Sequence, residues 1–225
     1  MSITRTDSFV CPCGATVVVD VVDSLNADRH PLLRQSVLDR RLHTATCKPC
    51  GRVTAVEQRF LYVDLERRQV LGVFPRNART EADRHARHLQ DTYERWFCTD
   101  ASQWIRERAK TCLVRACFGL EELREKLVAD EARVDDYRLE LLKCILMAQD
   151  PRYEAEQVAT LRLDRVTDDG MLELVPVDAN DQPLGWAVSV PRDGLGQVPV
   201  EAMRHAFRIA VGPHVSMLRL AQAAR

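Results

Sequence analysis

Several features that would assign a function directly are missing from this sequence. No apolar run approaches the roughly 20 residues that a membrane-spanning helix needs. The 225 residues carry a formal net charge of −1 and only 6% aromatic residues, so the whole chain has no charge excess that favours nucleic acid or an anionic membrane surface. We find no glycine-rich phosphate loop, no Gly-x-Ser-x-Gly, no Ser-His-Asp arrangement and no internal repeat. We therefore expect no enzymatic activity and no catalytic residues.

What remains is the composition of a soluble globular protein, with 46% hydrophobic and 29% charged residues. The first residues contain no apolar stretch of the signal-peptide kind, so we expect a cytoplasmic location. In a reducing compartment the eight cysteines are thiols or metal ligands rather than disulfides.

Two closely spaced cysteine pairs are the strongest signal in the chain. The first is Cys11-Pro12-Cys13-Gly14 and the second is Cys47-Lys48-Pro49-Cys50-Gly51. Each pair can offer two thiolates from one tight turn, and the glycine after it lets the backbone bend around a metal. The pattern predicts one structural zinc ion held by Cys11, Cys13, Cys47 and Cys50. Such a site has no open coordination position and hence no metal-based catalysis.

Two alternatives to this four-cysteine site stay open. The Cys11-Pro12-Cys13 turn has a tight bite, so His30 or His43 could replace one cysteine ligand. Cys47-Lys48-Pro49-Cys50 could instead form a redox pair, as in thioredoxin-like proteins. That chemistry needs a helix after the first cysteine, whereas residues 52–56 favour a strand.

The first 76 residues have the pattern of a compact unit. Residues 15–22 are rich in β-branched side chains and predict a strand. Apolar residues recur on one helical face from Pro31 to about Arg41. Further strands are predicted at residues 53–56, 59–65 and 70–75.

The remainder changes its periodicity twice, which gives an α+β fold class. Residues 77–150 predict a helical segment, and residues 151–225 predict a C-terminal antiparallel β-meander with two helices. These two segments can form one domain that follows the compact unit of residues 1–76. The helices are expected at residues 81–97, 100–118, from 120, 137–148, 199–211 and 213–224.

The first unit resembles the CpXC family, a bacterial and archaeal domain named for its Cys-Pro-x-Cys motifs. The resemblance covers roughly residues 8–76 and is carried by the two cysteine pairs, Asp23-Ser24-Leu25-Asn26, Pro31-Leu32-Leu33-Arg34 and Leu61-Tyr62-Val63-Asp64. It implies a zinc-ribbon-like domain and brings no established activity. The first pair is one residue shorter than the family motif, and the second has its proline one place later.

The other four cysteines have spacings unlike those of ligand pairs. We expect them to be small buried residues within helices: Cys98, Cys112, Cys117 and Cys144.

Two further pairs of side chains admit a structural and a functional interpretation. His85 and His88 share one helical face, which we interpret as a solvated surface rather than a metal site. Trp96 and Trp104 are expected to pack helices together in the core, although they could also form a partner site.

These observations favour a non-enzymatic, cytoplasmic zinc-binding protein that acts as a binding or scaffold module, with a protein partner or with itself. One alternative is a nucleic-acid-associated zinc ribbon, in which Arg40-Arg41 and Arg67-Arg68 would contact phosphates. The other is a thiol-disulfide oxidoreductase that uses Cys47 and Cys50.

Overall fold

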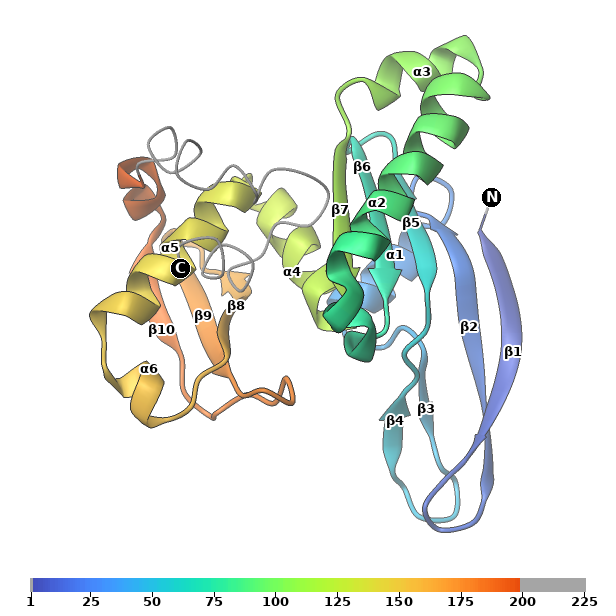
Figure 1. Ribbon diagram of the computed structural model, residues 1–225. Helices are drawn as coiled ribbons and strands as arrows, with labels where there is room; N and C mark the ends of the chain where they lie inside the picture. Colours follow the sequence, from blue (N-terminus) through green and yellow to red (C-terminus); the bar gives the residue numbers. More distant parts are fainter. Residues whose placement is uncertain (1, 199–225) are drawn as a thin grey trace. The chain divides into compact units, whose positions relative to one another are not determined.

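A mixed five-stranded sheet forms the centre of the first of two structural units. The computed structural model describes residues 2–198 (Figure 1), and the chain divides between Arg124 and Glu125. The fold is α+β, as predicted. The helices predicted at residues 199–211 and 213–224 lie outside the described residues.

The sheet of the first unit combines local hairpins with parallel pairings between distant segments. In spatial order the strands are β1 (Ile3–Val10), β2 (Thr16–Asn26), β5 (Phe60–Asp64), β6 (Gln69–Phe74) and β7 (Leu113–Phe118). β1 runs antiparallel to β2, and β5 runs antiparallel to β6. β2 pairs with β5, and β6 with β7, in parallel.

β7 corrects one element of the sequence prediction. The helix expected at residues 100–118 is α3 (Gln103–Ala109), and the chain then becomes β7, with Cys117 buried in the strand. Because β7 pairs with β6, the first unit continues well past residue 76, where we expected the first domain to end. β1 was not predicted either, since its side chains are mostly exposed at the edge of the sheet.

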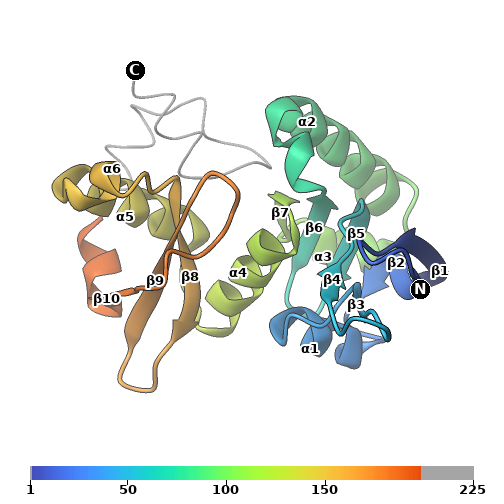
Figure 2. The same ribbon diagram turned by 90° about the horizontal axis from the view of Figure 1, so that it is seen from below.

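Helices cover both faces of this sheet (Figures 1 and 2). On one face, η1 (Arg76–Glu81), α2 (Ala82–Tyr93), a π-helical segment η2 (Glu94–Thr99) and α3 follow one another. α2 buries Ala86, Leu89 and Tyr93, which lie on one side of the helix. The opposite face carries α1 (Pro31–Leu38), whose buried Arg34 lies 3.9 Å from the carboxylate of Asp64.

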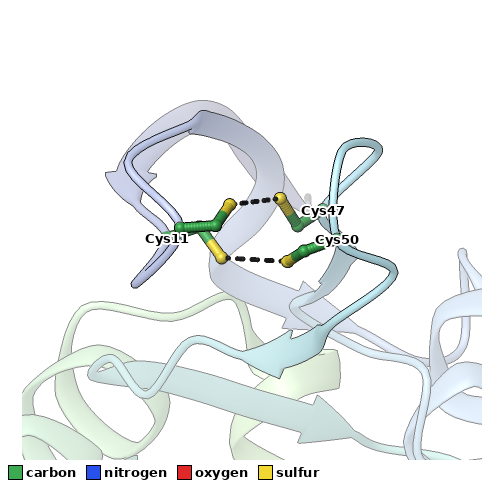
Figure 3. Close-up of side chains that lie close together, drawn as sticks. Cys11, Cys47 and Cys50 are labelled. Carbon is green, nitrogen blue, oxygen red and sulfur yellow. Dashed lines mark hydrogen bonds between the residues drawn. The ribbon is translucent and has the colours of Figure 1, made fainter.

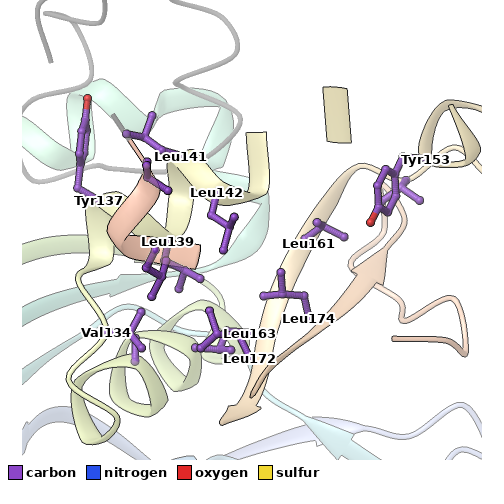
Figure 4. Packing of buried hydrophobic residues seen from close by; sticks show 14 residues of the cluster. Val134, Tyr137, Leu139, Leu141, Leu142, Tyr153, Leu161, Leu163, Leu172 and Leu174 are labelled. Atoms are coloured by element: carbon purple, nitrogen blue, oxygen red, sulfur yellow. The ribbon is translucent and has the colours of Figure 1, made fainter. Parts of the chain in front are cut away.

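The second unit contains the predicted three-stranded antiparallel meander, in the order β10-β9-β8. Its elements are the C-terminal part of α4 (Leu120–Glu131), α5 (Asp136–Gln149), α6 (Arg152–Ala155), β8 (Thr160–Val166), β9 (Met171–Val177), β10 (Val188–Pro191) and η3 (Arg192–Gln197). Leucines from α5, such as Leu139 and Leu142, pack with Leu163 and Leu174 of the strands (Figure 4).

A buried cluster of charges lies beside this apolar core. Nζ of Lys143 is 2.6 Å from Glu125 and 3.1 Å from Glu140, and Nζ of Lys126 is 2.9 Å from Glu140. Lys126 also contacts Asp136, and all five side chains are at least nine-tenths buried. The low dielectric surroundings strengthen each contact, but they also make the loss of one partner costly.

Candidate metal centre

The first cysteine turn joins β1 to β2. The backbone N–H of Cys11 donates to the carbonyl of Ala15 at 2.9 Å, and that of Gly14 donates to the carbonyl of Cys11 at 2.8 Å. Gly14 has a φ of 88°, a conformation that favours glycine because it has no Cβ. The turn therefore closes within a few residues and keeps both cysteines at the tip of the hairpin.

The second turn joins β3 (Thr44–Thr46) to β4 (Val53–Ala55), a short hairpin of its own. The N–H of Cys47 donates to the carbonyl of Arg52 at 2.8 Å, and that of Gly51 donates to the carbonyl of Cys47 at the same distance. Gly51 has a φ of 72°. Although the two turns have different lengths, each is closed by the same kind of backbone bond and by a glycine.

The two turns face each other (Figure 3) and bring all four cysteines together. The Sγ atoms lie within 4.8 Å of one another, with Cys11 3.6 Å from Cys50 and Cys13 3.5 Å from Cys47. Zinc–sulfur bonds of about 2.3 Å in a tetrahedron place neighbouring sulfurs about 3.8 Å apart. The cluster therefore has the size and the donor set for one metal ion bound by four cysteines.

The four thiols differ in exposure and in acidity. Cys11 and Cys47 are buried, whereas Cys13 and Cys50 are exposed. A hydrogen bond from the N–H of Ala15, together with the neighbouring sulfurs, lowers the pKa of Cys13 to about 7. The N–H of Cys50 lowers the pKa of Cys47, but burial and the other sulfurs outweigh it and raise this pKa to about 12. The shortened first turn thus still supplies a backbone donor to a sulfur.

Neither histidine considered as a substitute ligand joins this cluster. Among the described residues, the four cysteines form the one group with metal-ligand geometry. Nε2 of the buried His43 accepts a hydrogen bond from the N–H of Val22 at 2.9 Å, so its lone pair is already used. His30 is exposed at the N-terminus of α1.

Three expectations about the remaining cysteines were wrong. Cys98 is exposed on η2, Cys112 lies between α3 and β7, and Cys117 lies in a strand, so neither of the last two is in a helix. Cys112 and Cys144 are partly buried, and Cys144 lies in α5 as expected.

The aromatic side chains of the middle segment also differ from the prediction. Trp96 and Trp104 are each 57% exposed rather than packed in the core. The ring of His85 lies tilted by 36° against that of Phe74 with their centroids 4.5 Å apart, whereas His88 is exposed.

The paired arginines considered for nucleic-acid binding are mostly engaged within the chain. Arg40 lies 3.0 Å from Glu121, and Arg41 contacts Asp39. Arg67 lies 3.6 Å from a carboxylate oxygen of Asp64. These contacts neutralise the positive charge that phosphates would require.

The sequence prediction missed buried polar side chains in each of the two units. His43 was considered only as a metal ligand, and the buried charges of α4 and α5 were not identified. The signal for the latter is the spacing of Glu140 and Lys143 inside the leucine-rich α5.

Comparison with known proteins adds one relationship. The sequence model of the family described as CpXC protein matches residues 9–143, which is more than half of the chain. The match begins beside the first cysteine turn and reaches well beyond residue 76, to which we had traced the resemblance. No curated protein and no solved structure matches the chain. In the part of the chain that the structure describes, no helix has the length and apolarity required to cross a membrane.

Proposed function

Because this chain belongs to the CpXC family, we propose that its four clustered cysteines hold one structural zinc ion. We further propose that the protein is a non-enzymatic binding module of the cytoplasm, whose metal site shapes an interaction surface. The observation that carries this proposal is the convergence of four Sγ atoms within 4.8 Å from two separate hairpins.

The choice of zinc follows from the donor set. Four thiolates are soft ligands that favour zinc or iron–sulfur chemistry over magnesium, calcium or manganese. A single ion satisfies S···S distances of 3.5 and 3.6 Å, and it places positive charge where four thiols crowd together. Cys11, Cys13, Cys47 and Cys50 would hold the ion, which would cross-link the two hairpins.

The absence of a free coordination position supports a structural role. With all four corners of a tetrahedron taken by protein sulfurs, the metal cannot bind and activate water. Its contribution is the folding free energy that it adds to two hairpins whose own cores are small. The buried cluster here consists of Cys11, Val17 and Cys47, with Phe9, Ala15 and Ala45 packed against it.

The binding role is supported by apolar side chains on the same two hairpins. Val10 is 71% exposed, Val18 62% and Val53 65%. Val10 and Val18 lie on the β1–β2 hairpin, and Val53 begins β4. Exposed apolar residues gathered near a rigid metal site suit a protein partner or a second copy of this chain.

Elemental analysis of the purified protein tests the metal assignment. We expect about one zinc per chain in the unchanged protein and a large loss of zinc in Cys11→Ser and in Cys47→Ser. Cys98→Ser is the matched control, because Cys98 is exposed on η2 and belongs to no cluster of potential ligands among the described residues. Cobalt substitution should give the visible absorption of a tetrahedral sulfur site. Iron with sulfide, or no metal at all, would contradict the assignment.

Analytical ultracentrifugation tests self-association, one form of the binding role. If the valines form a contact between copies, Val18→Lys should lower the sedimentation coefficient without releasing zinc. If the unchanged protein is a monomer, the partner must be a different protein. Affinity purification would then identify it as a protein that binds the unchanged chain and is lost from the Val18→Lys variant.

The oxidoreductase alternative is less well supported. Redox catalysis needs an accessible first cysteine of low pKa at a helix N-terminus. Cys47 is buried, its pKa is raised, and a strand follows Cys50. Slow reaction of zinc-bound protein with a thiol reagent, and no insulin reduction, would exclude this activity.

The nucleic-acid alternative has its own test. If the paired arginines bound nucleic-acid phosphates, the affinity for mixed DNA or RNA would be high at low salt and would fall steeply as the salt concentration increases. We expect no such binding because most of these arginines already pair with carboxylates.

A further inference from the structure

A cavity of about 540 Å³ lies in the first unit, away from the cysteine turns. Its lining comes from strands β1, β2, β5 and β6 on one side and from α2 and η2 on the other. This volume falls in the range of sites that bind small organic molecules. The geometry points to a binding site for a small planar organic anion, meaning an aromatic ring that carries a carboxylate, sulfonate or phosphate group.

The apolar part of the lining suits a flat ring. Phe74 and Leu89 line the cavity and are buried, and Leu61 packs against the same apolar cluster, so these side chains present a fixed hydrophobic surface. Trp96 lines the cavity from η2 and is 57% exposed, so part of its indole surface remains accessible to a ligand. An aromatic ligand gains both burial of its own surface and ring contacts with such side chains.

The charged side chains of the lining determine which sign of charge the ligand should carry. Arg59 and Arg95 both line the cavity, and neither has a carboxylate partner among residues 2–198. The guanidinium of Arg59 lies 5.4 Å from the ring centroid of Phe74, which leaves its N–H donors available. Arginine presents these donors in a planar fork that matches carboxylates and phosphates.

The acidic residues of the lining do not cancel this positive charge. Asp23 accepts a hydrogen bond from Nε of Arg5 at 3.2 Å and is therefore already paired. Asp91 contributes one negative charge from α2. The two positive charges of Arg59 and Arg95 thus outnumber the single negative charge of Asp91. The cavity therefore favours an anion over a cation or a neutral molecule.

The backbone conformation of η2 adds an independent observation. The N–H of Asp100 donates to the carbonyl of Arg95 at 2.8 Å, a five-residue spacing that defines a π-helical turn. Such turns are rare and occur frequently at functional sites. Here the turn carries the consecutive residues Arg95 and Trp96, both of which line the cavity, so one widened turn supplies a cationic and an aromatic group.

Titration of the full-length, zinc-containing protein with 2-naphthoate tests this inference. Ligand-observed NMR should show saturable binding at one site, and the neutral analogue 2-naphthalenemethanol should bind at least tenfold more weakly. Arg59→Gln and Arg95→Gln should each weaken naphthoate binding about tenfold, as expected for the loss of one charged hydrogen bond. Trp96→Ala should weaken the acid and the alcohol alike, because the ring contact does not depend on charge.

Arg87→Gln is the matched control, because Arg87 is exposed on α2 but does not line the cavity. It should bind naphthoate as the unchanged protein does, and circular dichroism should show that all variants remain folded. Three results would each overturn the inference: no saturable binding of naphthoate, equal affinity for the acid and the alcohol, or an equal loss of affinity in Arg87→Gln and Arg59→Gln.

Discussion

Nε2 of His43 lies 2.9 Å from the backbone nitrogen of Val22, whose N–H it accepts. This bond ties the segment that enters β3 to the long strand β2. The imidazole also lies edge-on to Phe60, with ring centroids 5.2 Å apart, and is 2% exposed. A ring that accepts at Nε2 must be neutral, and burial lowers the pKa of His43 to about 4, although Asp23 acts in the opposite direction.

The pH dependence of stability should therefore include a contribution from His43. The unfolded chain has a histidine pKa of about 6.5, so between pH 6.5 and 4 the unfolded state binds more protons than the folded state. The stabilisation is fully present above pH 6.5 and is lost as pH falls towards 4, by up to about 3 kcal/mol. Urea unfolding at several pH values measures this loss.

The variant His43→Gln isolates that contribution, because glutamine can accept the same hydrogen bond but does not titrate. Its free energy of unfolding should fall less between pH 6.5 and 4 than that of the unchanged protein. His30→Gln, at an exposed position, should leave the pH profile unchanged. The same slope in the unchanged protein and in His43→Gln would show that His43 is not the source.

Removal of the metal should open the hairpins locally. β3 and β4 contain three residues each and cannot remain paired alone, whereas the strands β5, β6 and β7 are supported by helices. After treatment with a chelator, hydrogen exchange should accelerate at residues 44–55 and remain slow in β6. Uniform acceleration throughout the first unit would instead show that the whole sheet depends on the metal.

The glycine after the second cysteine pair should strengthen metal binding. Gly51 has a φ of 72°, and a Cβ there would meet no atom within 4 Å, so the cost of Gly51→Ala is conformational. A residue other than glycine in the left-handed conformation raises the free energy of the turn by about 1–2 kcal/mol. In a chelator competition, Gly51→Ala should therefore bind zinc roughly five- to thirtyfold more weakly than the unchanged protein. Gly51→Asn should lose less because asparagine tolerates this conformation. Gly194→Ala, at a position without a positive φ, should have no effect on zinc.

The buried charge cluster should respond strongly to the loss of one member. Lys143→Met leaves Glu125 and Glu140 buried without one of their cations, and we expect the free energy of unfolding to fall by about 3–5 kcal/mol. Adding Glu125→Gln should restore part of this loss, since the amide oxygen can still accept from the N–H of Leu163. Urea unfolding of the single and double variants measures the coupling.

An exposed ion pair provides the comparison. Lys110 lies 2.9 Å from Glu107, and both side chains are more than half exposed. Lys110→Met should change the free energy of unfolding by less than about 1 kcal/mol. Equal effects of Lys110→Met and Lys143→Met would contradict the argument that burial makes the cluster sensitive.

Local sequence patterns were sufficient for much of the fold. The cysteine pairs and their glycines lie within single turns, so their spacing alone indicated which residues would meet. The turn around Gly170 links β8 to β9 as the sequence indicated, since short apolar runs flank a turn residue.

Long-range pairings account for what the sequence did not reveal. β7 contains Arg115 and Cys117 among few β-branched residues, and its strand conformation depends on parallel pairing with β6, about 40 residues earlier. The role of His43 likewise depends on Val22, and the cavity is lined by Arg59 and Arg95, which are 36 residues apart in the sequence. These relationships exist only after tertiary packing, which a local pattern does not encode.

The late position of β7 has a consequence during protein synthesis. All four cysteines have been made once residue 50 is joined to the chain, whereas the five-stranded sheet requires residues up to Phe118. At roughly 5–20 residues per second, translation of the intervening segment takes several seconds. During that interval the nascent chain presents a complete set of thiol ligands without a complete sheet. If the cluster binds zinc as we propose, the metal can occupy these thiols before the sheet is complete, while the ribosome is still extending the chain.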